Sequence, residues 1–195
     1  MVRQEHGLVM NNSRVSHLQL WIQASFALSR AVPFFMMDVQ QLGQTEAYLL
    51  DIEEHFKKQY KRMNNGEPIN HDVDAMLMNR LVGFSKYWVF GLYELLRTLR
   101  EVTTQPQQKK SFHPPYDVFE SLFWDIEILR MPLAKYEVAK INGIQHWPSL
   151  RFYPDYGCCG WEVFCKKSNG LRVISRVELS NGFLSAVQQL KDNPQ

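Results

Sequence analysis

Charged side chains recur along one side of a helix that the sequence predicts between residues 70 and 104. Lys86, Glu94, Arg97 and Glu101 fall roughly on that side. Arg97 follows Glu94 by three residues and precedes Glu101 by four, and these spacings allow ion pairs on a helix surface. Two interpretations stay open: a solvated polar face, which is favoured, or a polar cluster in a cleft where Arg97 binds an anion.

A second group of charges accompanies a predicted helix break. Pro132 lacks an amide donor and clashes with the preceding turn, so we expect the helix around it to kink or end near Arg130. Backbone groups freed there, together with Arg130, Lys135, Tyr136 and Glu137, would suit an anion. Helix breaks also occur for structural reasons, and that explanation is favoured. The full candidate anion site is Lys86, Glu94, Arg97, Arg130, Lys135, Tyr136 and Glu137.

Aromatic residues are dense near the C-terminal part of the chain, where strands are predicted. Aromatic side chains anchor many protein interfaces. The candidate interface consists of Trp147, Phe152, Tyr153, Tyr156 and Trp161.

Several chemistries lack a matching pattern. Cys158, Cys159 and Cys165 do not have paired C-x2-C spacing, and a structural zinc takes four ligands, so we expect no metal. Neither a P-loop nor a G-x-G-x-x-G fingerprint occurs, so we expect no nucleotide cofactor. A cysteine nucleophile would need a histidine that the sequence does not locate. Glu53 and Glu54 are predicted to lie on a helix surface.

Composition indicates a folded globule. The 195 residues are 45% hydrophobic and 22% charged, with a formal net charge of +2. Binding to nucleic acid stays possible, but a dedicated binder usually has a stronger basic excess. The chain opens without a secretion signal and has an odd number of cysteines, which predicts a cytoplasmic protein with free thiols. Lys86 and Glu94 interrupt the longest apolar run, so no membrane span is expected.

The long helix is the predicted centre of the fold. Asn70 can cap its first turn, and apolar residues then recur at helical spacing. The run from Tyr87 to Tyr93 is apolar nearly all round, which predicts burial on most sides. Gly91 would let another helix come close.

Four further helices are predicted around it. They span residues 16–31, residues 45–63 with Thr45 as the cap, a segment from Pro114 to near Arg130, and residues 180–190. Gly43 is interpreted as a break, and Asn64-Asn65-Gly66 as a left-handed stop.

Residues 160–178 predict an antiparallel β-hairpin with a three-residue loop. This register would pair Trp161 with Val177 and Glu162 with Arg176. Since a lone hairpin is marginal, it must pack on the helices or gain a third strand. The fold class is therefore α+β, mainly α: a helical bundle around a central helix at about 70–104, the hairpin at about 160–178, and a final short helix. One domain, 1–195, would comprise a helical core, 16–148, and an appendage, 149–195.

The helical outline resembles the HEPN family of small helical RNases. Their motif is an arginine followed four to six residues later by a histidine, and here Tyr136 stands six residues after Arg130. The resemblance therefore covers the helix layout only, because the histidine expected as general acid–base residue is absent from this position. We expect a non-enzymatic interaction or regulatory module acting on a protein partner or as a homo-oligomer. The alternative is a metal-independent RNase using Arg130 and its polar neighbours.

Overall fold

The computed structural model describes residues 12–30, 32–68, 71–104, 117–135, 139–141, 144–146, 149–153, 158–165 and 170–192. The helices in these residues are α1 (Asn12–Ser29), α2 (Phe35–Asn64), α3 (His71–Thr104), α4 (Asp117–Lys135) and α5 (Arg176–Asp192). The strands are β1 (Ala139–Ile141), β2 (Ile144–His146), β3 (Ser149–Tyr153), β4 (Cys158–Cys165) and β5 (Gly170–Ser175).

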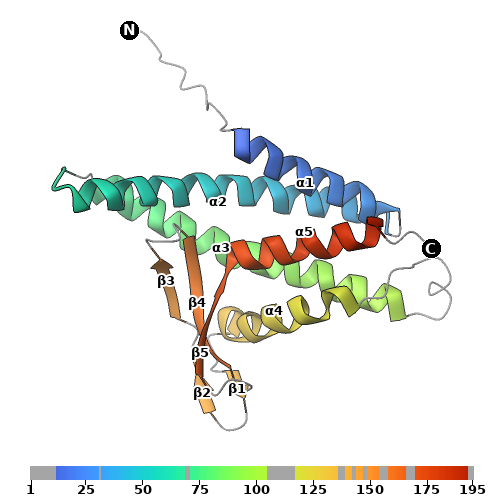
Figure 1. Cartoon of the computed structure of the whole chain (residues 1–195). Coiled ribbons are helices and arrows are strands. Elements are labelled where there is room, and N and C mark those ends of the chain that lie inside the picture. The colour runs from blue at the N-terminus through green and yellow to red at the C-terminus, as the bar shows by residue number, and fades with distance from the viewer. Residues whose placement is uncertain are drawn as a thin grey trace.

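The helices form a bundle, and a small antiparallel sheet lies against it (Figure 1). Each helix packs on the next in the sequence, and α5 returns to pack on α1. Strands β3, β4 and β5 form the sheet in that order, and β4 contacts α2, α4 and α5. β1 and β2 form a separate hairpin that the sequence analysis did not predict. The mainly helical α+β fold is confirmed.

The long central helix is confirmed as α3, which lies between α2 and α4. Trp88, Val89 and Leu92 are buried in its middle. Tyr87 differs from the predicted burial, because 69% of it is exposed. Asn70, the predicted cap, lies outside the described residues. No described helix combines the length and apolar character needed to cross a membrane.

The predicted start of the second helix is wrong. α2 begins at Phe35 and runs through Gly43, and the Thr45 hydroxyl donates a hydrogen bond to the Gln41 carbonyl inside the helix. Gly43 serves close packing, because a Cβ there would lie 2.4 Å from Cβ of Trp21 on α1. Contact with α1 therefore outweighs the helix cost of glycine. The predicted left-handed stop is confirmed at Gly66, whose φ is 73°.

Three other boundaries also differ from the predictions. α1 begins at Asn12 rather than Ser16, and α5 begins at Arg176 rather than at about Ser180. α4 continues through Pro132 to Lys135, so the predicted end near Arg130 is wrong, and the alternative of a kink there stays a prediction. Leu129 is buried before the proline and Leu133 packs on the core after it, so burial on both sides holds the helix across the lost hydrogen bond.

The predicted hairpin exists, but its register is wrong. Trp161 pairs with Ile174 rather than Val177, and Cys165 pairs with Gly170. Glu162 pairs with Val173 and forms its ion pair with Arg151 of β3, at 3.1 Å. The pairing is shifted by three residues, and β5 ends at Ser175, three residues before the predicted end at Glu178.

A capping box ends β5 and starts α5. The Glu178 amide donates to the Ser175 hydroxyl at 3.1 Å, and the Ser175 amide donates to the Glu178 carboxylate at 3.0 Å. This reciprocal pair satisfies two amides at the start of the helix. It fixes Arg176 as the first residue of α5, where its side chain is fully buried.

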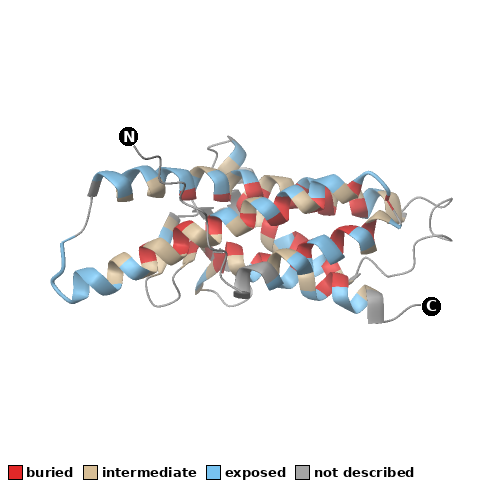
Figure 2. Cartoon of the chain, turned by 90° about the horizontal axis from the view of Figure 1, so that it is seen from above, coloured by how far each residue is buried: buried red, intermediate tan, exposed pale blue. Residues whose placement is uncertain are grey.

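Aromatic side chains fill the centre of the bundle. Trp21 stacks on Phe183 with ring centroids 5.0 Å apart and meets Trp88 edge-on at 6.1 Å. Figure 2 shows the buried residues along the facing sides of the helices. This core joins α1, α3 and α5, which lie far apart in the sequence.

Candidate functional site

The charged residues predicted on α3 form an exposed ion-pair group. The Arg97 Nε donates to Glu94 at 2.8 Å, and the Arg97 Nη1 donates to Glu101. The hydrogen bond that Arg97 donates to Glu94, followed by the negative charges of both glutamates, raises the pKa of Arg97. The Lys86 ammonium lies 5.8 Å from the centre of the Phe90 ring. Around Arg97, the structure therefore agrees with the first interpretation, a solvated polar face.

Arg130 belongs to a different group of side chains. Its guanidinium lies 4.5 Å from the centre of the Tyr93 ring, between α4 and α3. Burial, followed by the charge and hydrogen bond of Glu127, raises the pKa of Tyr93. The Lys135 side chain, Tyr136 and Glu137 lie outside the described residues. Arg130 and Arg97 thus contact different partners, and the nuclease hypothesis stays a prediction.

The candidate interface aromatics that the structure describes mainly serve the core. Only 2% of Trp161 is exposed, and the half-buried Phe152 lies 5.6 Å from Phe56, centre to centre. Tyr153 is also half-buried, and burial raises its pKa. Trp147 and Tyr156 lie outside the described residues.

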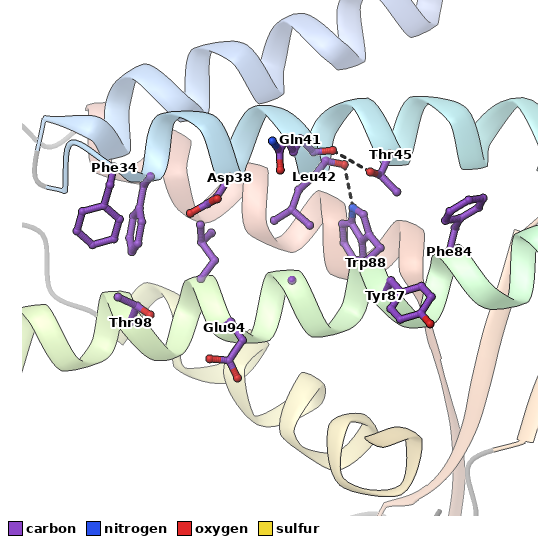
Figure 3. A pocket seen from close by; sticks show the side chains of 13 residues that line it. Phe34, Asp38, Gln41, Leu42, Thr45, Phe84, Tyr87, Trp88, Glu94 and Thr98 are labelled. Carbon is purple, nitrogen blue, oxygen red and sulfur yellow. Dashed lines mark hydrogen bonds between the residues drawn. The ribbon is translucent and has the colours of Figure 1, made fainter. Parts of the chain in front are cut away.

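A groove between α2 and α3 presents aromatic side chains that are exposed (Figure 3). Its volume is about 560 Å³. Phe34 lies at one end and Phe84 and Tyr87 at the other, with Asp38 and Glu94 on opposite sides between them. The lining residues are Phe34, Phe35, Asp38, Gln41, Leu42, Thr45, Phe84, Tyr87, Trp88, Gly91, Glu94, Leu95 and Thr98.

The floor of the groove is closely packed. The Trp88 indole N–H donates to the Leu42 carbonyl at 3.1 Å and is buried. A Cβ on Gly91 would lie 2.9 Å from Cδ2 of Leu42, so the missing side chain lets α2 approach α3, as predicted for this glycine. Direct contact between the two helices therefore forms the floor.

A second group of polar residues lies in the core, under strand β4. The Arg176 guanidinium is fully buried between two carboxylates of α2. Its Nη2 donates to Glu53 at 2.5 Å, and its Nη1 lies 3.1 Å from the Glu46 carboxylate. The other Glu53 oxygen accepts a hydrogen bond from the Cys159 amide at 3.2 Å. The expectation that Glu53 lies on a helix surface is wrong.

Burial controls the electrostatics of this cluster. It raises the pKa of Glu53 above the ordinary value of 4.5, and repulsion from Glu46 adds to the rise, while Arg176 and the Cys159 amide oppose it. Protonation of Glu53 would leave the Glu46 carboxylate and the Arg176 guanidinium as one pair of opposite charges in the core. The imidazole Nε2 of His17 lies 3.3 Å from Glu46 and so ties α1 to the same cluster.

One sequence signal for the buried glutamates was present. Glu46 and Glu53 alternate with Leu49 and Phe56 at spacings of three and four residues, so they share the buried side of α2. Carboxylates on such a side need a partner. The S-x-x-E pattern of Ser175 and Glu178 also marked the start of α5.

The described cysteines show no sign of nucleophilic chemistry. Burial, followed by the charge of Glu53, raises the pKa of Cys159 to about 12, and burial also raises the pKa of Cys158. A thiolate is the reactive form, so both thiols are poor nucleophiles near neutral pH. Within the described residues, no three His, Cys, Asp or Glu side chains are placed to hold a metal ion.

The chain matches no protein-family model, no curated protein and no solved structure. The class that the structure itself defines is a mainly helical α+β bundle with an aromatic groove on its surface and an ion-pair cluster in its core.

Proposed function

We propose that this protein is a non-enzymatic interaction module, which holds an apolar, basic segment of a partner protein in the groove between α2 and α3. The observation that carries the proposal is the exposure of three large aromatic side chains around one hollow. Phe34 is 63% exposed, Phe84 42% and Tyr87 69%. Exposed apolar surface that is contiguous marks many binding sites, and aromatic side chains supply much of their binding energy.

The charges of the groove support a basic partner. The described residues of its lining include Asp38 and Glu94 but no lysine, arginine or histidine. The whole chain carries a formal charge of +2, so the acidic character is local. Complementary charge favours the right partner and speeds its encounter.

The side chains of the groove favour binding over catalysis. Among the lining residues that the structure describes, none is a histidine, lysine or cysteine, which are among the usual proton-transfer groups and nucleophiles near neutral pH. Its polar groups are carboxylates, hydroxyls and the Gln41 amide, which can orient a bound segment.

A selection from a phage-displayed library of random 20-residue peptides tests the proposal. The wild-type protein should enrich peptides that are apolar and basic. Replacing Phe84 and Tyr87 by alanine should weaken the affinity of these peptides at least about tenfold, because both rings are anchors at the groove. Unfolding of the double variant should stay close to wild type, since both side chains are substantially exposed.

Phe26→Ala is the matched control. Phe26 is 52% exposed on α1 and does not line the groove, so its loss should leave peptide binding unchanged. The proposal is wrong if no peptide is enriched, or if the enriched peptides bind the Phe84→Ala/Tyr87→Ala variant as tightly as wild type.

A further inference from the structure

Residues that line the groove, together with Arg80 and Tyr48 of the adjoining hollow, follow heptad spacing on both helices. On α3, Arg80, Phe84, Tyr87, Gly91, Glu94 and Thr98 are separated alternately by four and three residues. On α2, Asp38, Gln41, Thr45 and Tyr48 are separated by three, four and three. Such spacing places each set along one side of its helix. The two stripes share the a/d spacing of coiled coils, with apolar side chains at Phe84, Tyr87 and Tyr48 and polar side chains at most other positions.

The apolar surface continues beyond the first groove. The rings of Tyr48 and Phe84 meet edge-on at 5.7 Å, and the Tyr48 hydroxyl accepts a 3.5 Å hydrogen bond from Arg80. Past this pair lies a second hollow of about 450 Å³, which Tyr48 and Arg80 also line. Leu18, Ala47, Ile52 and Leu77 form much of its wall. The two hollows therefore adjoin at the Tyr48–Phe84 pair.

We propose that the partner segment is a basic amphipathic helix, which lies along the outward stripe of α3 with a Lys or Arg side chain between Asp38 and Glu94. This inference rests on the proposed function and specifies the partner. The stripe from Arg80 to Thr98 is about 27 Å long at about 1.5 Å per residue, which is five helical turns. Apolar side chains of the helix fill the space above Gly91 and contact Tyr87.

The charges select a basic helix over an acidic one. Asp38 is exposed and, within the described part of the chain, forms no ion pair. Among the described residues, Glu94 forms its ion pair with Arg97. In the second hollow Asp51 accompanies Arg80, and His55 is held by Asp74 at 2.7 Å. Docking an apolar helix would remove water from Asp38, and a buried carboxylate needs a counter-charge.

Two phage libraries of 20-residue peptides test the inference. One fixes leucines at heptad spacing and randomises the other positions, and the second is identical except for a central proline, which breaks a continuous helix. The first library should yield binders that carry a lysine or arginine at a constant position, and the second should yield none. A synthetic binder should gain helical circular dichroism on addition of the protein.

Charge reversal provides the decisive comparison. Asp38→Lys should weaken the synthetic binder roughly tenfold, and replacing the constant basic residue of the peptide by glutamate should restore binding to this variant. Glu120→Lys, which changes an exposed carboxylate on α4, is the matched control and should have no effect.

The failures of the inference and of the proposed function are distinguishable. Equal binding by the proline library, or indifference to Asp38→Lys, overturns the helical or basic character of the partner. The proposed function survives that result if loss of Phe84 and Tyr87 still weakens binding. If neither library yields a binder, both are overturned.

Discussion

Arg97 and Arg176 each contact two glutamates, one arginine on the surface of α3 and the other in the centre of the molecule. Arg97 and its partners on the same helix are all substantially exposed. Arg176 is fully buried, and its partners on α2 are at most 2% exposed. The same combination of one arginine and two glutamates thus occurs once on the exposed surface and once in the buried core. The comparison shows how burial decides what an ion pair does.

Exposure to water makes the contribution of the Arg97 ion pairs to stability small. Exposed charges are well solvated when apart, so their pairing contributes little to folding. Burial reverses this balance at Arg176, because its charge and those of the glutamates have lost their hydration. Removing one partner there leaves the others uncompensated. The core cluster also joins the start of α5 and the amide of Cys159 in β4 to α2, so it fixes the sheet against the bundle.

The largest expected effect is that of Arg176→Ala. It should lower the free energy of unfolding by about 3–5 kcal/mol, because Glu46 and Glu53 would stay buried without a cation. Since domains are typically stable by about 5–15 kcal/mol, the variant would be marginal. Urea unfolding followed by circular dichroism measures the change.

A triple variant separates lost charge from lost packing. Arg176→Met combined with Glu46→Leu and Glu53→Leu removes all three charges while keeping apolar volume. It should recover most of the stability that Arg176→Ala loses. If the triple variant were as unstable as Arg176→Ala, uncompensated charge would not be the cause.

The second prediction concerns the pH dependence of stability. The pKa of Glu53 is raised in the folded protein above its ordinary value of 4.5. Between pH 4.5 and the raised pKa, the folded state binds more protons than the unfolded state. The free energy of unfolding therefore falls as the pH rises through this range. One such group contributes a slope of at most about 1.4 kcal/mol per pH unit. Glu53→Gln should remove this contribution.

Urea unfolding at a series of pH values from 4.5 upward measures the difference between wild type and variant. Glu54→Gln is the matched control, because Glu54 is the neighbouring carboxylate and pairs only loosely with Lys58 at 3.8 Å. Its profile should follow wild type. Parallel profiles for wild type and Glu53→Gln would show that Glu53 does not titrate in this window.

The two arginines also show what the sequence could predict. The pairs of Arg97 follow from the geometry of one helix, so spacing alone predicted them. Glu53 lies 123 residues from Arg176, and no local pattern connects such distant positions. The long helix and the hairpin were predictable because their periodicity is local. The hairpin register was not, because it depends on the length and type of the loop, which the alternation of apolar residues does not fix.

The groove was missed for a related reason. Phe84 lies at helical spacing with the buried residues Leu81 and Trp88, yet it is 42% exposed. Periodicity shows which residues share a side of a helix, but not whether another element covers that side. The structure supplies this information for α3, where α4 covers Tyr93 and no described element covers Tyr87.

Arg172 provides a third, intermediate case. Its guanidinium forms two hydrogen bonds with Asp125, at 2.8 and 2.7 Å, and thereby connects β5 to α4. The arginine side chain is 48% exposed and the aspartate 18%. Arg172→Ala should lower the free energy of unfolding by about 1 kcal/mol, between the effects at the other two arginines. A loss as large as that of Arg176→Ala would mean that burial does not rank these pairs.

The smallest expected effect is that of Arg97→Ala. The substitution leaves Glu94 and Glu101 in water, where both carboxylates are solvated, and alanine favours the helix. The urea midpoint should therefore match wild type within experimental error, and added salt should change the two proteins equally because the pairs are already screened. A clear loss of stability would show that Arg97 holds more than its two helix neighbours. It would then remove the contrast between surface and core on which the ranking of the three arginines depends.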